Sequence, residues 1–229
     1  MLQNIKELLY NFSNEPIFKD FFFVGGTALS YFLNHRISYD LDFISFEKLD
    51  PLKIKAFGIK YDANYIPDMN AATFKINTGE EIEKYKIMFS FNGIKVEFFY
   101  PNNEIVSEII KKSEIVLVKG NIKTFELSTL AKLKLHALFN RNKIRDLFDV
   151  FVLLDKNILT VDDIDKFTSL NTNKTFVEFI EDFKDDGEES LDFDKENEYY
   201  VKFYNNNNLD FIKKELLKEY IKRVKNENG

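Results

Sequence analysis

The sequence predicts a mixed α/β (α+β) fold, in which a sheet with flanking helices is followed by a bundle of helices. Strand-like segments, either apolar throughout or alternating, are confined to the first half of the chain. In the second half, apolar residues recur with helical spacing. The 229 residues are enough for two small domains. We therefore expect an α/β domain over residues 1–125 and a helical domain over residues 126–229.

The first half contains a succession of short elements. In chain order we expect a helix at 3–12, a strand at 20–24, a helix at 27–34, a strand at 38–46, a hairpin at 86–100, a helix at 103–112 and a strand at 114–118. The hairpin turns at Asn92-Gly93, a pair typical of a type I′ turn. In the strand at 38–46, alternation places Asp40 and Asp42 together on one face.

Helices dominate the second half. The expected helices are 128–139, 144–156, 175–183 and 210–224. Ser128 is a suitable N-cap for the first of them. The apolar stripe along 210–224 predicts that this helix packs against its neighbours. An acidic loop is expected at 186–198 and a polar spacer at 205–208.

Composition narrows the location and the cofactor. The chain has no cysteine and two histidines, which excludes disulfides and argues against a zinc site. Any metal would need oxygen ligands, which suits Mg²⁺ or Mn²⁺. No apolar run is long enough to span a membrane, and the first residues lack the apolar core of a signal peptide. We expect a cytoplasmic protein without membrane contact.

The net charge of −6 is unevenly distributed. Residues 104–146 carry 9 basic and 5 acidic residues, whereas the chain before and after them is net acidic. This stretch could bind a polyanion, but the composition is not that of a general nucleic-acid binder. Only 4 of the 32 basic residues are arginines, and Arg36, Arg141 and Arg145 lie in the two motifs described next. Arginine suits planar bidentate partners such as phosphate or a buried carboxylate.

The first motif begins with a pair of glycines between an expected strand and an expected helix. Gly25 and Gly26 permit a tight turn and close approach by a ligand. The N–H groups that open the helix favour an anion, and Thr27 adds a hydroxyl. The arrangement is typical of a phosphate cradle, and an ordinary turn is the alternative.

Three carboxylates accompany this motif. Asp40 and Asp42 would lie about 6–7 Å apart on one strand face, where they repel each other unless a cation lies between them. Glu97 stands within an otherwise apolar segment of the hairpin. Together the three acids suit metal-assisted phosphoryl transfer. The alternative is a solvated acidic face on an edge strand.

The second motif lies about a hundred residues further on. Lys134 and Arg141 share a helix face if the helix continues that far. Arg145, Asp146 and Asp149 follow closely. The spacing by itself also allows a cluster of Arg–Asp ion pairs that holds the helical half on the α/β half.

The combination of these motifs resembles a known family. The strings GGTAL (25–29), HRISYDLDF (35–43) and KLHALFNRNKIRDLFDV (134–150) are similar to those of nucleotidyltransferases of the DNA polymerase β type. In particular, they resemble the AbiEii/AbiGii toxin family. The resemblance implies the nucleotidyltransferase fold over roughly residues 20–155.

The resemblance also implies roles for individual residues. Gly25, Gly26 and Thr27 are expected to hold the triphosphate of the nucleotide. Arg36 and Ser38 are expected either to bind the nucleotide by steadying its phosphates or to brace the loop. Arg141 is a further residue expected to bind the nucleotide. Asp40, Asp42 and Glu97 are the expected metal ligands, although Glu97 stands where many relatives have Asp and could instead be a base or neither. Lys134 is expected on phosphate, and Asp146 is expected as an acid/base group or a brace. His35 and His136 are expected to be structural.

The implied activity is transfer of NMP from an NTP to an acceptor hydroxyl, with Mg²⁺ or Mn²⁺ as cofactor. The acceptor would be RNA, such as a tRNA 3′ end, and the protein would be the toxin of a toxin–antitoxin or abortive-infection pair with a cognate antitoxin. One alternative is a nucleotidyltransferase that acts on a small molecule or a protein. Another is a non-catalytic nucleotide-binding module on the same fold.

Overall fold

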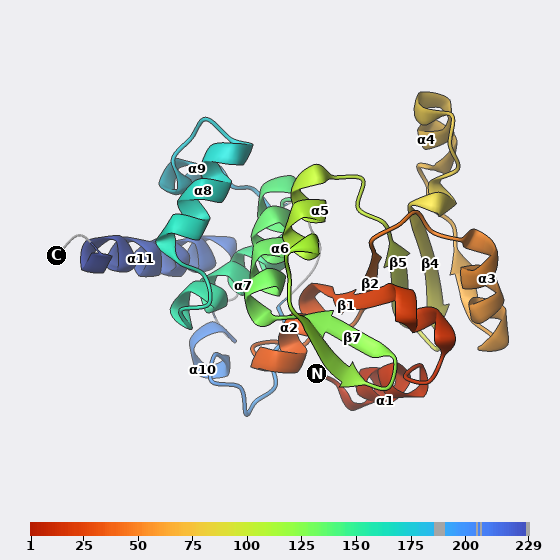
Figure 1. Ribbon diagram of the computed structural model, residues 1–229. Helices are drawn as coiled ribbons and strands as arrows, with labels where there is room; N and C mark the ends of the chain where they lie inside the picture. Colours follow the sequence, from red (N-terminus) through yellow and green to blue (C-terminus); the bar gives the residue numbers. More distant parts are fainter. Residues whose placement is uncertain (186–190, 205, 207, 228–229) are drawn as a thin grey trace. The chain divides into compact units, whose positions relative to one another are not determined.

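The chain divides into two units in the computed structural model, which describes residues 1–185, 191–204, 206 and 208–227 (Figure 1). The first unit comprises residues 1–31 and 38–126. The second comprises residues 32–37 together with the chain from residue 127 onward. No sequence pattern indicated that 32–37 would group with helices so much later in the chain.

A seven-stranded mixed sheet forms the centre of the first unit, with the strand order β3-β4-β5-β2-β1-β7-β6. The strands are β1 (Phe21–Val24), β2 (Leu41–Ser45), β3 (Asn64–Ile66), β4 (Lys86–Phe91), β5 (Ile94–Phe99), β6 (Ile115–Lys119) and β7 (Ile122–Phe125). The central strand β2 is antiparallel to β1 and parallel to β5. The predicted mixed sheet is confirmed, although β3 and β7 were not expected.

Helices and two short 3₁₀ turns connect these strands. They are α1 (Gln3–Asn11), η1 (Pro16–Asp20), α2 (Gly25–Leu33), α3 (Pro51–Lys60), α4 (Ala71–Thr78), η2 (Ile82–Lys84) and α5 (Glu104–Lys111). Asp50 caps α3 by accepting hydrogen bonds from two backbone N–H groups of its first turn. Asn103 caps α5 by accepting one from the backbone N–H of Val106. Both helices therefore begin where their sequences supply an oxygen acceptor.

Phenylalanine rings fill the core of the first unit. Phe18, Phe43 and Phe98 are fully buried. The ring centroids of Phe18 and Phe43 are 4.7 Å apart, and those of Phe43 and Phe98 are 5.5 Å apart, within the range of favourable aromatic pairs. Since Phe43 follows Asp42 and Phe98 follows Glu97, this packing fixes the two strand segments that carry the acids.

Two predictions about local structure in the first unit have different outcomes. Asn92 and Gly93 both have positive φ, 51° and 84°, which confirms the type I′ turn of the hairpin. The strand expected from residue 38 begins only at Leu41. Asp40 therefore lies just before β2, and the predicted start of this strand at residue 38 is wrong.

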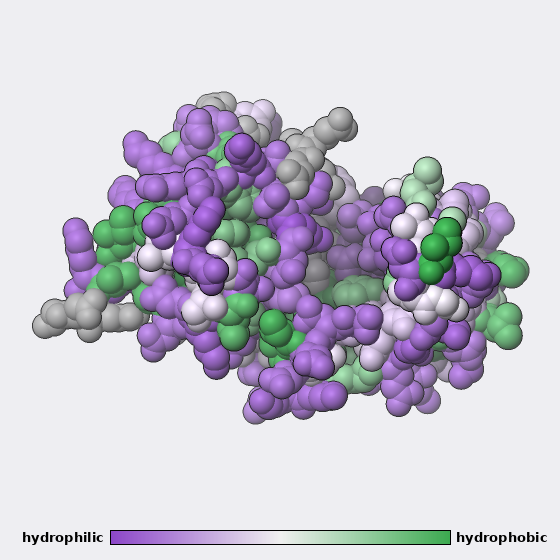
Figure 2. Space-filling model, turned by 90° about the horizontal axis from the view of Figure 1, so that it is seen from above, coloured by the Kyte–Doolittle hydropathy of each residue, from purple (hydrophilic) through white to green (hydrophobic). Residues whose placement is uncertain are grey.

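The helix α4 differs from its neighbours because none of its residues is buried. Met69, just before it, is 93% exposed, and Ile76 within it is 83% exposed. Figure 2 shows a small apolar patch over α4 on a face that is otherwise mainly hydrophilic. Tertiary packing therefore contributes little to the stability of this helix.

Helices make up the second unit, as predicted. They are α6 (Leu127–Asn140), α7 (Ile144–Asp155), α8 (Val161–Asn171), α9 (Phe176–Asp182), α10 (Tyr200–Phe203) and α11 (Leu209–Glu227). Every residue of α7 except Arg145 and Asp155 is buried, which makes α7 the central helix. The amphipathic helix α11 contacts α7 and buries Ile212 and Leu216.

Some expectations for the second half need correction. Helix α6 already begins at Leu127, so Ser128 lies within the helix and is not its N-cap. Helix α8 was not expected, although Thr160 and Asp163 form a capping box at its start. Parts of the expected acidic loop and polar spacer, 186–190, 205 and 207, lie outside the described residues. No helix within the described ranges has the length and apolar character needed to cross a membrane.

Candidate functional site

The first part of the candidate site is the junction between β1 and α2. Gly25 has φ of +80°, and a Cβ at this position would lie 2.2 Å from Oδ2 of Asp42. Only glycine tolerates both the backbone conformation and this contact. The antiparallel register that pairs Val24 with Asp42 brings the two segments together. The Asp42 carboxylate therefore lies against the backbone where α2 begins.

A buried pair of hydroxyls holds the loop that carries Asp40. The Thr27 Oγ1 lies 2.8 Å from the Ser38 Oγ and also contacts the Asp40 carbonyl oxygen. Because a carbonyl only accepts, Thr27 donates its single proton to it, and Ser38 donates to Thr27. Both residues are buried. Their hydroxyls thus brace the loop, and their predicted contact with the nucleotide stays a prediction.

The third carboxylate comes from the adjacent strand. Glu97 on β5 is the register partner of Asp42 on β2, so the two residues lie side by side across the parallel pair. The carboxylate of Glu97 forms an ion pair with Lys95, with 3.1 Å between Nζ and Oε2. Sequence reasoning missed Lys95, although its spacing of two from Glu97 on a strand could have revealed it.

Lys95 responds electrostatically to all three acids. Partial burial by itself would lower the pKa of Lys95. The ion pair with Glu97 and the charges of Asp42 and Asp40 outweigh burial, so the pKa is raised instead. The ammonium form of Lys95 is therefore favoured within this group of acids.

The acids of the first unit fit a metal that is shared with a substrate. Among the residues that the structure describes, no three carboxylate or imidazole side chains lie close enough together to hold a metal ion. Magnesium in phosphoryl-transfer sites commonly takes one or two carboxylates and completes its coordination with phosphate oxygens and water. The Asp42 carboxylate, which lies against the backbone of Gly25 at the start of α2, fits the role of such a ligand. Asp40 and Asp42 are the residues that would hold the metal.

The second unit contains a buried network of charges centred on Asp149. Its two carboxylate oxygens accept hydrogen bonds from Nε and Nη2 of Arg36, at 2.6 and 2.9 Å. The Nζ of Lys134 lies 3.0 Å away, and Nε2 of His35 lies 2.7 Å away. These four side chains are buried. Asp149 thereby ties the segment 32–37 to helices α6 and α7.

Asp146 extends this network by one turn of α7. It accepts a hydrogen bond of 2.7 Å from Nζ of Lys134 and one of 2.7 Å from Nε of Arg141. Helix α6 ends at Asn140, so Arg141 lies just beyond it, yet it reaches the same carboxylate as Lys134. The structure thus brings together four of the predicted residues, Arg36, Lys134, Arg141 and Asp146, and adds His35 and Asp149.

Burial and neighbouring charges shift the pKa values of this network. Burial would raise the pKa of Asp149, but Arg36 and Lys134 outweigh it and hold the pKa well below its usual range. For His35, burial prevails over the attraction of Asp149 and lowers the pKa. The imidazole is therefore neutral at pH 7, and its Nε2–H donates to Asp149. Within the described residues, Nδ1 of His35 has no hydrogen-bond partner.

Comparisons with known proteins agree with this architecture. Residues 7–219 match the family described as "Nucleotidyl transferase AbiEii toxin, Type IV TA system". JHP933 from Helicobacter pylori is 17% identical and superposes with a TM-score of 0.50 over 98% of this chain and 92% of that one. An H. pylori protein described as a candidate nucleotidyltransferase is 18% identical, with a TM-score of 0.54 over 97% and 92%. No curated protein matches the sequence. At these identities, the likeness to solved structures concerns the fold.

Proposed function

The chain belongs to the AbiEii family of nucleotidyltransferase toxins of type IV toxin–antitoxin systems, and on that premise we propose that it transfers NMP from an NTP to an acceptor hydroxyl. One observation carries this proposal furthest, namely that the Asp42 carboxylate lies against the backbone of Gly25. A triphosphate bound at the start of α2 would lie beside that carboxylate. Two anions so close require a cation between them, which Mg²⁺ or Mn²⁺ supplies.

The reaction balances as a simple displacement. The acceptor oxygen attacks the α-phosphorus of the NTP, a new P–O bond forms, and the bond to the bridging oxygen of the β-phosphate breaks. Pyrophosphate leaves with that oxygen, and the acceptor proton passes to a base or to water. When bound, the metal neutralises charge on the phosphates and on the leaving pyrophosphate.

We assign the residues of the first unit as follows. Asp40 and Asp42 hold the metal, and the N–H groups at Gly25 and Gly26 receive the phosphates. Thr27 and Ser38 fix the loop that carries Asp40, because their hydroxyls bond to each other and to that loop.

Within the second unit, Asp149 holds a set of charged groups. Lys134 is assigned to a phosphate by family resemblance, and Asp146 to proton transfer or bracing. Arg36 forms a two-pronged interaction with Asp149, so we assign it as a brace for this network. Arg141 pairs with Asp146 and is 56% exposed in its side chain, which leaves it accessible to a nucleotide.

RNA is the acceptor class that we propose, with a tRNA 3′ end as the specific case. The segment 104–146 is the part of the chain with an excess of basic residues, and such an excess attracts a polyanion. A cognate antitoxin is the partner that the family implies. The rest of the chain is acidic, which favours a local contact with RNA and not a broad one.

A transfer assay tests this function. The wild type is incubated with Mg²⁺, total tRNA and each labelled NTP in turn, alongside Asp42→Asn and the exposed Asp182→Asn as a matched control. We expect label on RNA with the wild type and with Asp182→Asn. Loss of the metal ligand should reduce the rate on the order of a hundredfold or more. Equal transfer by all three proteins, or none with any NTP, would contradict the proposal.

The acceptor is tested separately. Replacing total tRNA by a protein mixture or by small hydroxyl compounds distinguishes the two alternatives within the enzyme class. Label on either of these, with none on RNA, would retain nucleotidyl transfer and reject the RNA acceptor. Binding of Mg²⁺ and NTP without any transfer would instead indicate a non-catalytic module.

A further inference from the structure

An ammonium group stands among the acids of the first unit. Lys95 and Glu97 are two residues apart on β5, so both side chains project from the same face of the strand. The two form an ion pair, and Glu97 is the register partner of Asp42. The face that carries the candidate metal ligand therefore also carries a fixed positive charge.

We propose that Lys95 binds the phosphates of the NTP and that Glu97 acts by aligning Lys95 instead of by binding the metal. This inference rests on the proposed nucleotidyl transfer, and it decides among the roles that the sequence left open for Glu97. It adds Lys95 to the nucleotide-binding residues and removes Glu97 from the metal ligands.

The surroundings of the pair support a role in binding an anion. The side chain of Lys95 is 40% exposed and that of Glu97 is 19% exposed, so the ammonium remains accessible while its partner is largely covered. An ammonium has three donors, and the ion pair with Glu97 engages one of its protons. The remaining donors can bond to phosphate oxygens, which makes Lys95 a point charge beside the triphosphate.

The same pair argues against Glu97 as a metal ligand. A metal would have to displace the ammonium from the carboxylate before it could bind. Asp40 and Asp42 with phosphate oxygens satisfy the usual coordination of Mg²⁺.

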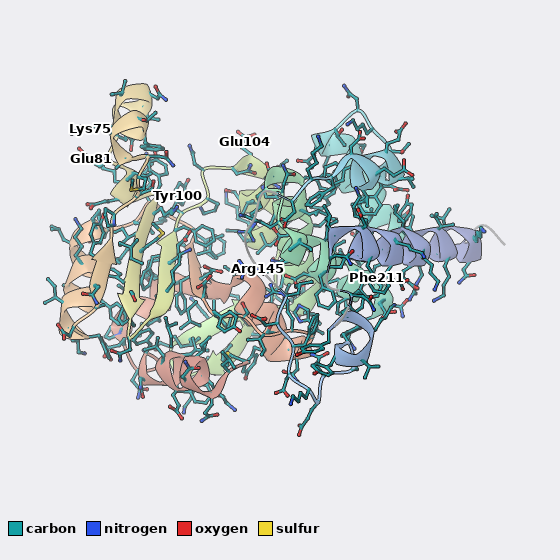
Figure 3. The ribbon with its side chains drawn as sticks, turned by 180° about the vertical axis from the view of Figure 1, so that it is seen from behind. Lys75, Glu81, Tyr100, Glu104, Arg145 and Phe211 are labelled. Atoms are coloured by element: carbon teal, nitrogen blue, oxygen red, sulfur yellow. The ribbon has the colours of Figure 1, made fainter. Side chains whose placement is uncertain are left out.

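A second Lys–Glu pair in the same unit provides matched controls. Lys75 on α4 pairs with Glu81 at 2.5 Å, and their side chains are 60% and 58% exposed. Figure 3 shows the two residues close together at α4. The substitutions Lys75→Met and Glu81→Gln therefore repeat the chemical changes of Lys95→Met and Glu97→Gln on a pair outside the candidate site.

Two binding measurements test the proposal. The first is the dissociation constant of ATP, CTP, GTP and UTP with Mg²⁺, by calorimetry. The second is the dissociation constant of Mn²⁺ without nucleotide, by electron paramagnetic resonance. We expect Lys95→Met to weaken binding of the preferred NTP about tenfold, because a charge-assisted contact is lost. Binding of Mn²⁺ should be unchanged or tighter, because a competing cation is gone. General damage to the fold would instead weaken the binding of both NTP and Mn²⁺.

Glu97→Gln separates alignment from metal binding. It should weaken NTP binding in the wild-type background but have no further effect in the Lys95→Met background, as a double-mutant cycle measures. Its Mn²⁺ affinity should stay within about twofold of the wild type, and the controls at 75 and 81 should match the wild type in both measurements.

The measurements distinguish a failure of the roles assigned to Lys95 and Glu97 from a failure of the proposed nucleotidyl transfer. NTP binding unchanged by Lys95→Met, or Mn²⁺ binding strongly weakened by Glu97→Gln, would reject the inference and leave nucleotidyl transfer standing. Failure of the wild type to bind any NTP with Mg²⁺ would reject the proposed function and this inference with it.

Discussion

At the residue scale, Gly25 is subject to two constraints at once. Its φ of +80° lies in the left-handed region, and an added Cβ would contact Oδ2 of Asp42 at 2.2 Å. The positive φ and the nearby carboxylate therefore both favour a residue without a side chain at position 25. The approach of Asp42 to the backbone depends on it.

Gly25→Ala should therefore damage both stability and nucleotide binding. We expect a backbone cost of about 1–2 kcal/mol in the free energy of unfolding, plus displacement of the Asp42 carboxylate. Gly79→Ala is the matched control, because Gly79 has φ of +73° but open space around an added Cβ. Urea unfolding and NTP titration measure the two effects. Equal NTP affinity in both variants would show that the contact with Asp42 does not matter.

Asp149 is the shared partner of several buried cationic groups in the second unit. Asp149→Asn leaves the buried Arg36 and Lys134 without their shared countercharge. Removing one partner of a buried ion pair costs about 3–5 kcal/mol. Native-state hydrogen exchange of α7 measures this loss, with Asp182→Asn as the control, since Asp182 pairs with Lys174 on the surface. Unchanged protection of α7 in Asp149→Asn would refute the assigned bracing role.

At the scale of elements, helix α3 lies on the sheet through a close contact of its backbone. A Cβ added at Gly58 would lie 2.4 Å from Cε1 of Phe89 on β4. Phe89 is buried, with its ring near those of Tyr65 and Phe91. The ring cannot move freely, so the separation of α3 from β4 depends on the absence of a side chain at Gly58.

Gly58→Ala should change the free energy of unfolding in two opposite directions, through helix propensity and through packing. Alanine favours a helix by about 1 kcal/mol over glycine, but overpacking costs about 1–3 kcal/mol. We expect a net loss in the free energy of unfolding of the first unit. Phe89→Leu should relieve the contact, so the double variant should be more stable than the sum of the two single losses predicts. Simple additivity in this cycle would mean that the ring and the helix do not interact.

At the scale of the whole molecule, the two units are stabilised differently. Aromatic rings pack in the cores of both, and the second unit also buries a network of titratable groups. The folded-state pKa of His35 lies below its ordinary value of 6.5, so the unfolded state binds more protons as the pH falls below 6.5. The pKa values of Asp146 and Asp149 are also lowered. All three groups therefore destabilise the fold on acidification.

The second unit should consequently lose stability first as the pH falls. Below pH 6.5 the free energy of unfolding falls because His35 takes up a proton more readily in the unfolded state. Below about pH 3.8 it falls further for the same reason at Asp146 and Asp149. When the pH is lowered from 7 to 5, hydrogen exchange should show a greater loss of protection in α6 and α7 than in the sheet. His35→Gln should flatten this dependence more than His136→Gln, whose histidine is only partly buried. Earlier loss of protection in β1 and β2 would contradict the prediction.

The sequence by itself determined many of the local elements. Spacing predicted the helices α1, α7, α9 and α11, and Asn92-Gly93 predicted the hairpin turn, because these signals depend on neighbours in the chain. The same local information missed the strands β3 and β7 and the helices α3, α4, α8 and α10. Resemblance to a family added the metal and nucleotide roles, which still await the tests above.

Tertiary structure alone decided which charged groups meet. Glu97 lies beside Asp42 because β2 and β5 lie parallel in register. Asp149 gathers Arg36 and Lys134 because segment 32–37 groups with the second unit. Such contacts join residues far apart in the chain, and the free energy of a buried charge depends on which partners reach it. The spacing of residues along a single sequence does not reveal which partners reach a buried charge.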